Sequence, residues 1–254
     1  MGKKVLTGIA FLIGIVLIAG ILYIANEFLG NPVSKVLATS SVEKYVNEKY
    51  PNLNLKVESA KYNFKNNGYS SKAHSSSSVD THFDVYCDLI GNITRDSYEE
   101  SINKRFNTLE RLDEEYRKVV VPKIEKLGYD FNMILAGVQA NGNELLDIPL
   151  DMKLDLNKLP SKRLITYVTV YIYSDDFTWD NVARTALAID KAMENERLNI
   201  SKYTVGVYPT SFKEGKTYES IGVYDFDSKL LKSKDLPGFM KNYSEKMEKI
   251  NKDK

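Results

Sequence analysis

Residues 164–173 read LITYVTVYIY, a run in which nearly every position is β-branched or aromatic. A strand with this sequence would be apolar on both faces, which is typical of a central strand. We therefore predict a strand over residues 164–173 that forms the core of a folded unit. Upstream of it, residues 133–138 also look like a strand.

The residues that follow this run complete a β-α-β-β-α unit. Asp176 or Thr178 can cap a helix whose inner stripe has apolar residues at helical spacing. Strands are expected near residues 203–208 and 218–226, and a lysine-rich helix is expected at the C-terminus.

The preceding region, residues 31–128, is predicted to form an α-β-β-α unit. Asn31 offers an N-cap and Pro32 the first helical position, so a helix should run to about Tyr50, where Pro51 stops it.

Further along this region, composition and alternation separate a loop, a strand and a helix. Residues 65–79 are rich in Ser, Asn, Gly and Lys, which predicts a mobile hairpin loop. Strict alternation over residues 81–89 predicts a half-buried strand. Asp96 or Ser97 then caps a long helix that Pro122 should end or kink.

The N-terminal residues 5–25 contain no charged side chain. A helix of this length would span the roughly 30 Å hydrocarbon core of a bilayer. Lys3 and Lys4 precede the segment, which predicts a cytoplasmic N-terminus and an extracellular remainder. The apolar run is longer than that of a cleaved signal peptide, so we expect an uncleaved anchor in the cell membrane.

These elements predict an α+β fold with three parts. Residues 1–30 would be a cytoplasmic leader and single transmembrane helix, in contact with the lipid bilayer through residues 5–25. Residues 31–128 would form the first small α+β unit of an ectodomain, with a helix, a hairpin and a long helix. Residues 129–254 would form the second unit, β-α-β-β-α, which ends in the lysine-rich helix.

The composition excludes several classes of protein. The chain has 35 Lys and Arg residues against 34 Asp and Glu, a net charge of +1, so no global field attracts a polyanion and we expect no nucleic-acid partner. The single cysteine, Cys87, excludes an intramolecular disulfide and any zinc site with more than one thiolate from this chain.

One constellation could bind a metal. Strand geometry places Asp80, His82 and Asp84 on one face, at successive spacings of about 6.6 to 7 Å. One imidazole and two carboxylates could hold a divalent cation if a neighbouring strand supplied further ligands. A polar strand face also commonly meets only water, so both readings stay open.

Catalytic motifs find little support. A Ser-His-Asp triad would use His74 or His82, but the nearby serines lie in a loop-like sequence without a Gly-x-Ser-x-Gly turn. Cys87 and His82 would point to opposite faces of one strand. No nucleotide or calcium motif is present in the sequence. We therefore expect no catalytic residues and no cofactor.

Two features leave alternatives open. Asp175, Asp176 and Asp180, and the pair Asp225 and Asp227, could be read as carboxylates of a hydrolase, although helix capping explains the first group. Three of the 17 tyrosines, at positions 167, 171 and 173, fall in the predicted core strand. We interpret them as packing residues, with a carbohydrate-binding face as the alternative.

Short motifs carry a resemblance to a known family. The basic leader and apolar segment, followed by NPVSK at 31–35, YP at 50–51, YNFK at 62–65 and DTHF at 80–83, resemble the YfjL-like membrane-anchored proteins of Bacillus and its relatives. The likeness is strongest over about residues 1–90. It implies a Gram-positive cell-envelope protein without an assigned biochemical role, and it supplies no catalytic residues.

Together, these features favour a non-enzymatic envelope protein that binds a partner protein or a cell-wall component. The alternatives are a ligand or metal sensor built on Asp80, His82 and Asp84, and a carboxylate-based hydrolase.

Overall fold

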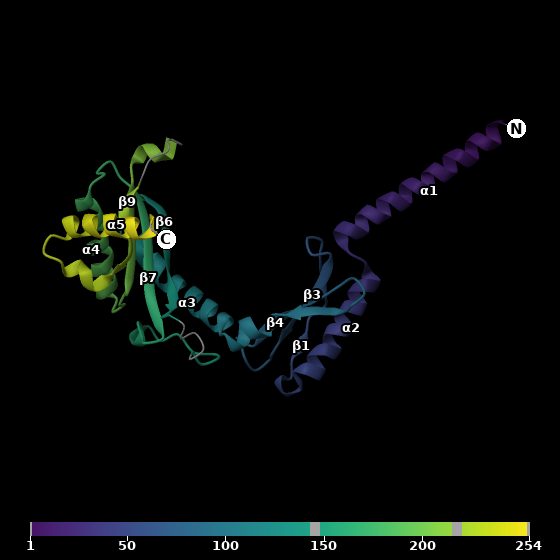
Figure 1. The fold of residues 1–254 in the computed structure, drawn as a ribbon, viewed down its shortest axis with the longest axis horizontal. Helices are drawn as coiled ribbons and strands as arrows, with labels where there is room; N and C mark the ends of the chain where they lie inside the picture. Colours follow the sequence, from purple (N-terminus) through teal and green to yellow (C-terminus); the bar gives the residue numbers. More distant parts are fainter. Residues whose placement is uncertain (1, 143–147, 215–219, 253–254) are drawn as a thin grey trace. The chain divides into compact units, whose positions relative to one another are not determined.

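The computed structural model describes residues 2–142, 148–214 and 220–252 and shows an α+β protein (Figure 1). The chain forms two compact units, Met1–Asn107 and Thr108–Lys254, and each unit contains its own β-sheet. The predicted α+β class is therefore confirmed.

The N-terminal segment forms a helix, α1 (Gly2–Leu29). Within the residues that the structure describes, however, no helix combines the length and the apolar character needed to cross a bilayer. The prediction of a transmembrane anchor over residues 1–30 is therefore wrong, together with the single-pass localisation that depends on it. An uncharged run favours a helix, as α1 shows, but does not by itself establish a membrane span.

The second helix, α2 (Pro32–Lys49), begins and ends where the sequence predicts. The Asn31 side chain accepts a hydrogen bond from the Val33 backbone N–H at 2.7 Å, and Pro32 fills the first helical position. The buried residues of the helix are Ala38, Val42 and Val46.

The first sheet is antiparallel throughout. Its strands are β1 (Lys56–Val57), β2 (Lys61–Asn63), β3 (Gly68–His74), β4 (His82–Cys87) and β5 (Ile93–Asp96). Strand β3 pairs with β1, β2 and β4, and β5 pairs with β4.

Strand β3 lies inside the region predicted to be a loop, residues 65–79. Its residues pair with β4 without interruption from Tyr69 opposite Cys87 to His74 opposite His82. The local composition resembles a turn, but a regular neighbouring strand supplies hydrogen bonds and a buried face that local composition does not show.

The long helix predicted after β5 is interrupted. A short π-helix, η2 (Glu99–Asn103), is followed by Arg105, whose φ of 62° lies in the left-handed region and breaks the helical path. Helix α3 (Phe106–Glu125) then continues through Pro122, which does not end it.

Helix α3 belongs mainly to the second unit, whereas the sequence placed it before a boundary at residues 128 and 129. Its inward residues join the core of the second unit, and these are Leu112, Tyr116, Val120 and Ile124. Helical periodicity identifies the buried stripe of a helix but not the sheet against which that stripe packs.

The second sheet has the strand order β6-β7-β8-β9. Its strands are β6 (Phe131–Ala140), β7 (Leu164–Tyr173), β8 (Lys202–Tyr208) and β9 (Ile221–Asp227). Strands β7 and β8 are parallel, and α4 (Trp179–Asn195) makes the crossover that a parallel pair requires. Helix α5 (Leu236–Lys252) follows β9, and 3-10 helices lie at Pro51–Leu53, Leu156–Lys158, Thr210–Glu214 and Ser228–Lys232.

The two faces of β7 differ. Alternate residues, Leu164, Thr166, Val168, Val170 and Ile172, are buried, and the apolar ones share a core with α3, α4 and α5. Figure 1 shows α4 and α5 on the same side of the sheet. The residues between them, including Tyr167, Tyr171 and Tyr173, are only half-buried. The strand itself is confirmed at both ends, but only one of its faces lies in the core.

Candidate functional site

The structure brings together only part of the metal constellation predicted from the sequence. His82 and Asp84 are half-buried on the same face of β4, whereas Asp80 precedes the strand and is buried. Across the described ranges 2–142, 148–214 and 220–252, no group of three or more His, Cys, Asp and Glu side chains is placed to hold a metal ion. The site at Asp80, His82 and Asp84 stays a prediction without a preformed ligand set.

The other sequence candidates serve local structure. Burial raises the pKa of the Cys87 thiol, and the nearby Asp88 raises it further, which disfavours a thiolate nucleophile. Asp176 accepts a hydrogen bond from the Thr178 hydroxyl at 2.7 Å, beside the start of α4. Asp227 accepts from the Lys229 backbone N–H at 3.0 Å and so caps a 3-10 helix.

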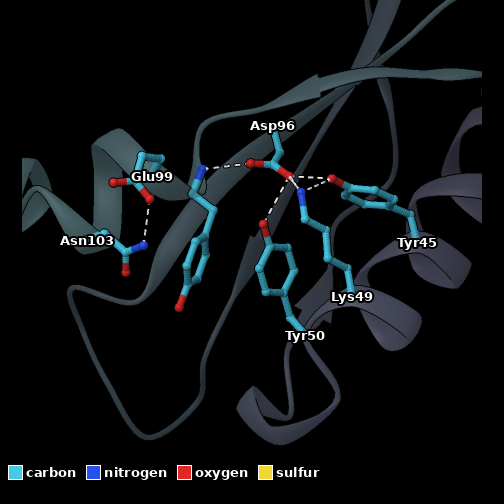
Figure 2. Close-up of polar contacts among 7 residues, drawn as sticks. Tyr45, Lys49, Tyr50, Asp96, Glu99 and Asn103 are labelled. Carbon is cyan, nitrogen blue, oxygen red and sulfur yellow. Dashed lines mark hydrogen bonds and ion pairs between the residues drawn. The ribbon is translucent and has the colours of Figure 1, made fainter.

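A polar cluster that the sequence did not reveal surrounds Asp96, at the end of β5 (Figure 2). One carboxylate oxygen, Oδ2, lies 2.8 Å from Lys49 Nζ and accepts the Tyr50 hydroxyl at 3.0 Å. The Tyr45 hydroxyl donates to the same oxygen. The other oxygen accepts the Tyr98 backbone N–H at 3.1 Å.

These contacts fix the charges of the cluster. Burial favours a raised pKa for Asp96, but the hydrogen bonds from Lys49, Tyr45, Tyr98 and Tyr50 outweigh it and lower the pKa overall. Hydrogen bonding to Asp96 raises the pKa of Lys49, and burial is the main cause that raises the pKa of Tyr50 to about 12. At neutral pH the cluster is therefore an ion pair with two neutral hydroxyl donors.

The Asp96 cluster locks α2 onto the first sheet. The Tyr50 ring stacks on Tyr98 with centroids 4.4 Å apart and meets Phe83 edge-on at 5.1 Å. Asp96 accepts several hydrogen bonds and has a lowered pKa, both of which make it a poor general base. We therefore assign this cluster a structural role.

The second sheet carries a different group of aromatic residues, on the side opposite α4 and α5 (Figure 1). Its members, which we call the tyrosine face, are Tyr171, Tyr173, Tyr208, Phe212 and Tyr224. Ring centroids of Tyr171 and Tyr208 are 5.5 Å apart, and those of Tyr208 and Phe212 are 4.6 Å apart in a stacked arrangement. The Tyr224 ring lies 6.5 Å from Tyr171. The side chains thus form a continuous aromatic surface across four elements, β7, β8, the 3-10 helix Thr210–Glu214 and β9.

Glycine makes this arrangement possible. Gly206 and Gly222 are direct partners on β8 and β9, and Gly206 is the β8 partner of Tyr171. A Cβ atom on Gly206 would lie 2.6 Å from the Tyr171 ring, so the ring rests directly on the backbone of β8.

The tyrosine face is accessible and has no charge at its centre. Tyr224 is 48% exposed, and the neighbouring β6 residues Met133 and Leu135 are 36% and 41% exposed. The outward residues of β7 from 165 to 173, and those of β8 from 204 to 208, are all uncharged.

Comparison with known proteins covers both units. The chain matches the model of the YfjL-like N-terminal domain over residues 3–97 and that of the YfjL-like C-terminal domain over residues 115–241. It is 27% identical over 235 residues to "Uncharacterized protein YfjL" of Bacillus subtilis (strain 168). The aligned region covers 89% of this chain and 94% of the relative. No solved structure shows significant similarity.

Proposed function

The chain belongs to the YfjL-like family, and we propose that its second unit is a non-enzymatic binding module that holds glycans on the tyrosine face. The observation that carries the proposal is an accessible group of aromatic rings on the sheet face opposite α4 and α5 (Figure 1). Core packing is already provided by the other face of the same strands.

The chemistry of the face suits a sugar. A pyranose ring presents C–H groups on its faces and hydroxyl groups around its edge. The apolar ring of a tyrosine can pack against the C–H groups, and its hydroxyl group can hydrogen-bond to the sugar hydroxyl groups. Threonine hydroxyls of the outward residues Thr169 and Thr204 add neutral polar groups between the rings.

A polyanion would need cations on this surface, because neutralised phosphates dominate nucleic-acid affinity. The outward positions of β7 carry none. Lys202, at the start of β8, has its Nζ 3.7 Å from Asp225 Oδ2, so its charge is already balanced. The face therefore favours a neutral ligand.

Binding without catalysis also follows from the side chains. Burial raises the pKa of Tyr171, and the adjacent hydroxyl groups of Tyr224 and Tyr208 raise it further. A neutral phenol at physiological pH supplies neither a general base nor a nucleophile.

The test is calorimetric titration of the full chain with three probes: hexamers of β-linked N-acetylglucosamine, of β-linked glucose and of α-linked glucose. We expect at least one hexamer to bind. Tyr208→Ala and Tyr224→Ala should each weaken binding by about tenfold, equivalent to about 1.4 kcal/mol. The matched control is Tyr86→Ala, a half-buried tyrosine of the first sheet, which should not change the affinity.

Failure of all three hexamers to bind would overturn the proposal. The same holds if binding survives both substitutions in variants whose thermal unfolding shows that they are folded.

A further inference from the structure

The chain has two histidines, His74 and His82, and the structure makes them direct cross-strand partners on β3 and β4. We propose that this pair binds a late first-row divalent cation, Cu²⁺, Ni²⁺ or Zn²⁺. Imidazole nitrogen is a preferred ligand of these ions.

The hydrogen-bond pattern sets the spacing of the pair. The neighbouring pair is hydrogen-bonded, because the Ser75 backbone N–H donates to the Thr81 carbonyl oxygen at 2.8 Å. Pair types alternate along an antiparallel ladder, so His74 and His82 occupy a non-hydrogen-bonded pair, in which Cα atoms are only about 4.5 Å apart. Two side chains there share one face and lie close enough to bind one ion at about 2.0–2.1 Å from each nitrogen.

The imidazole of His74 also has an unused polar atom. Its Nδ1 is buried and has no hydrogen-bond partner among the residues that the structure describes. A buried polar atom without a partner is costly, and coordination would satisfy it. Glu58 lies close by, with its Oε1 3.9 Å from His74 Nδ1.

The charges around the pair balance. Lys56 lies opposite His74 on β1, and Lys72 lies opposite Asp84 on β4. Both lysines are exposed, so their ammonium groups can stay in solvent. The Glu58 carboxylate lies on the same side of the imidazole as Nδ1 and is placed to offset the charge of a bound cation.

This site differs from the one predicted from the sequence, because it uses both histidines and neither Asp80 nor Asp84 as ligands. Two protein ligands leave the remaining positions to water. The site should therefore bind reversibly, unlike a closed structural zinc site.

The experiment is calorimetric titration of the full chain with Cu²⁺, Ni²⁺ and Zn²⁺ separately, with Mg²⁺ as the hard-cation control. We expect about one equivalent of a late first-row ion and no binding of Mg²⁺. His74→Gln and His82→Gln should each weaken binding by about tenfold or more, since loss of an outer-shell partner alone costs 10–100-fold. The matched controls Asp80→Asn and Asp84→Asn should leave the affinity unchanged.

Three results would overturn the proposal: no binding of any of the three ions, binding that persists when both histidines are replaced, or binding that depends on Asp80 or Asp84 but not on His74. A second measurement avoids substitutions altogether. Substoichiometric Cu²⁺ should broaden the imidazole NMR signals of both histidines in the unaltered chain, and broadening of one without the other would contradict a shared ion.

Discussion

Tyr45 and Tyr50 in the first unit and Tyr208 and Tyr224 in the second are chemically identical side chains in opposite situations. The first two donate hydrogen bonds to the Asp96 carboxylate. The other two belong to an aromatic surface without a carboxylate among its members. Tyr45 and Tyr50 hold α2 on the first sheet, whereas Tyr208 and Tyr224 lie at the surface of the second sheet.

The difference shows how surroundings decide what a tyrosine does. The half-buried Asp96 carboxylate binds phenolic hydroxyl groups because a hydrogen bond to an ionised acceptor is stronger than one between neutral groups. On the second sheet, Gly206 lets the Tyr171 ring lie against the backbone, and the neighbouring outward positions are uncharged. Aromatic area is therefore kept at the surface instead of being used in the core.

Removal of the Asp96 carboxylate should have the largest effect, and it should lower the stability of the first unit. Asp96→Ala leaves Lys49 and two phenols without their shared partner, and we expect the first unit to lose about 2–4 kcal/mol of unfolding free energy. Hydrogen exchange of the β4 amides in increasing denaturant measures this loss. Glu48→Gln, at an exposed pair with Lys44 on α2, is the control and should change stability by less than about 0.5 kcal/mol. A comparable loss in both variants would refute the special role of Asp96.

Acidification should remove the stabilisation that the ionised Asp96 carboxylate provides. The folded-state pKa of Asp96 is lowered, so its stabilisation is present above the unfolded-state value of about 3.9 and is lost as the pH falls through the lower folded value. The stability difference between the unaltered chain and Asp96→Asn should be constant from pH 7 to about 5 and shrink below about pH 4. A difference that instead shrinks near pH 6 would point to another group.

A methyl group added under the tyrosine face should affect binding more than folding. In Gly206→Ala the new Cβ would meet the Tyr171 ring at 2.6 Å and displace it. We expect about tenfold weaker glycan binding, or about 1.4 kcal/mol. Calorimetry of Gly206→Ala in a Tyr171→Ala background is the control, because without the Tyr171 ring the Gly206 substitution should not weaken glycan binding further. Additive losses would mean that Gly206 acts through something other than this ring.

The smallest effect belongs to a single hydroxyl group. Tyr50→Phe removes one hydrogen bond to Asp96 but keeps the ring stacked on Tyr98, so the first unit should lose about 1 kcal/mol. Denaturant unfolding checks the value, and glycan affinity should not change. A loss as large as that of Asp96→Ala would show that the phenol, not the carboxylate, organises the cluster.

Local signals predicted the elements that local chemistry determines. The boundaries of α2 follow from an N-cap, a proline at the first position and a proline after the end. Those of β7 follow from a run of β-branched and aromatic residues. The composition of β3 predicts a loop, and pairing with β1, β2 and β4 makes it a strand.

The two candidate sites cannot be predicted from local sequence. The Asp96 cluster joins residues that are distant in sequence, and the tyrosine face depends on which face of the sheet the helices cover. Lys49 and Asp96 are 47 positions apart, so no spacing rule links them. LITYVTVYIY is apolar on both faces, so the sequence predicts a packing role for Tyr171 and does not say which face the helices cover. The uncharged N-terminal run likewise predicted a helix correctly and its membrane surroundings wrongly.

The most direct test compares the two sets of tyrosines in one sample. Ring signals of the full chain, labelled with ¹³C at tyrosine, are followed by NMR during titration with whichever hexasaccharide binds. We predict shifts for Tyr171, Tyr208 and Tyr224 and none for Tyr45 and Tyr50. Shifts confined to Tyr45 and Tyr50, or equal in both sets, would contradict a glycan site on the tyrosine face.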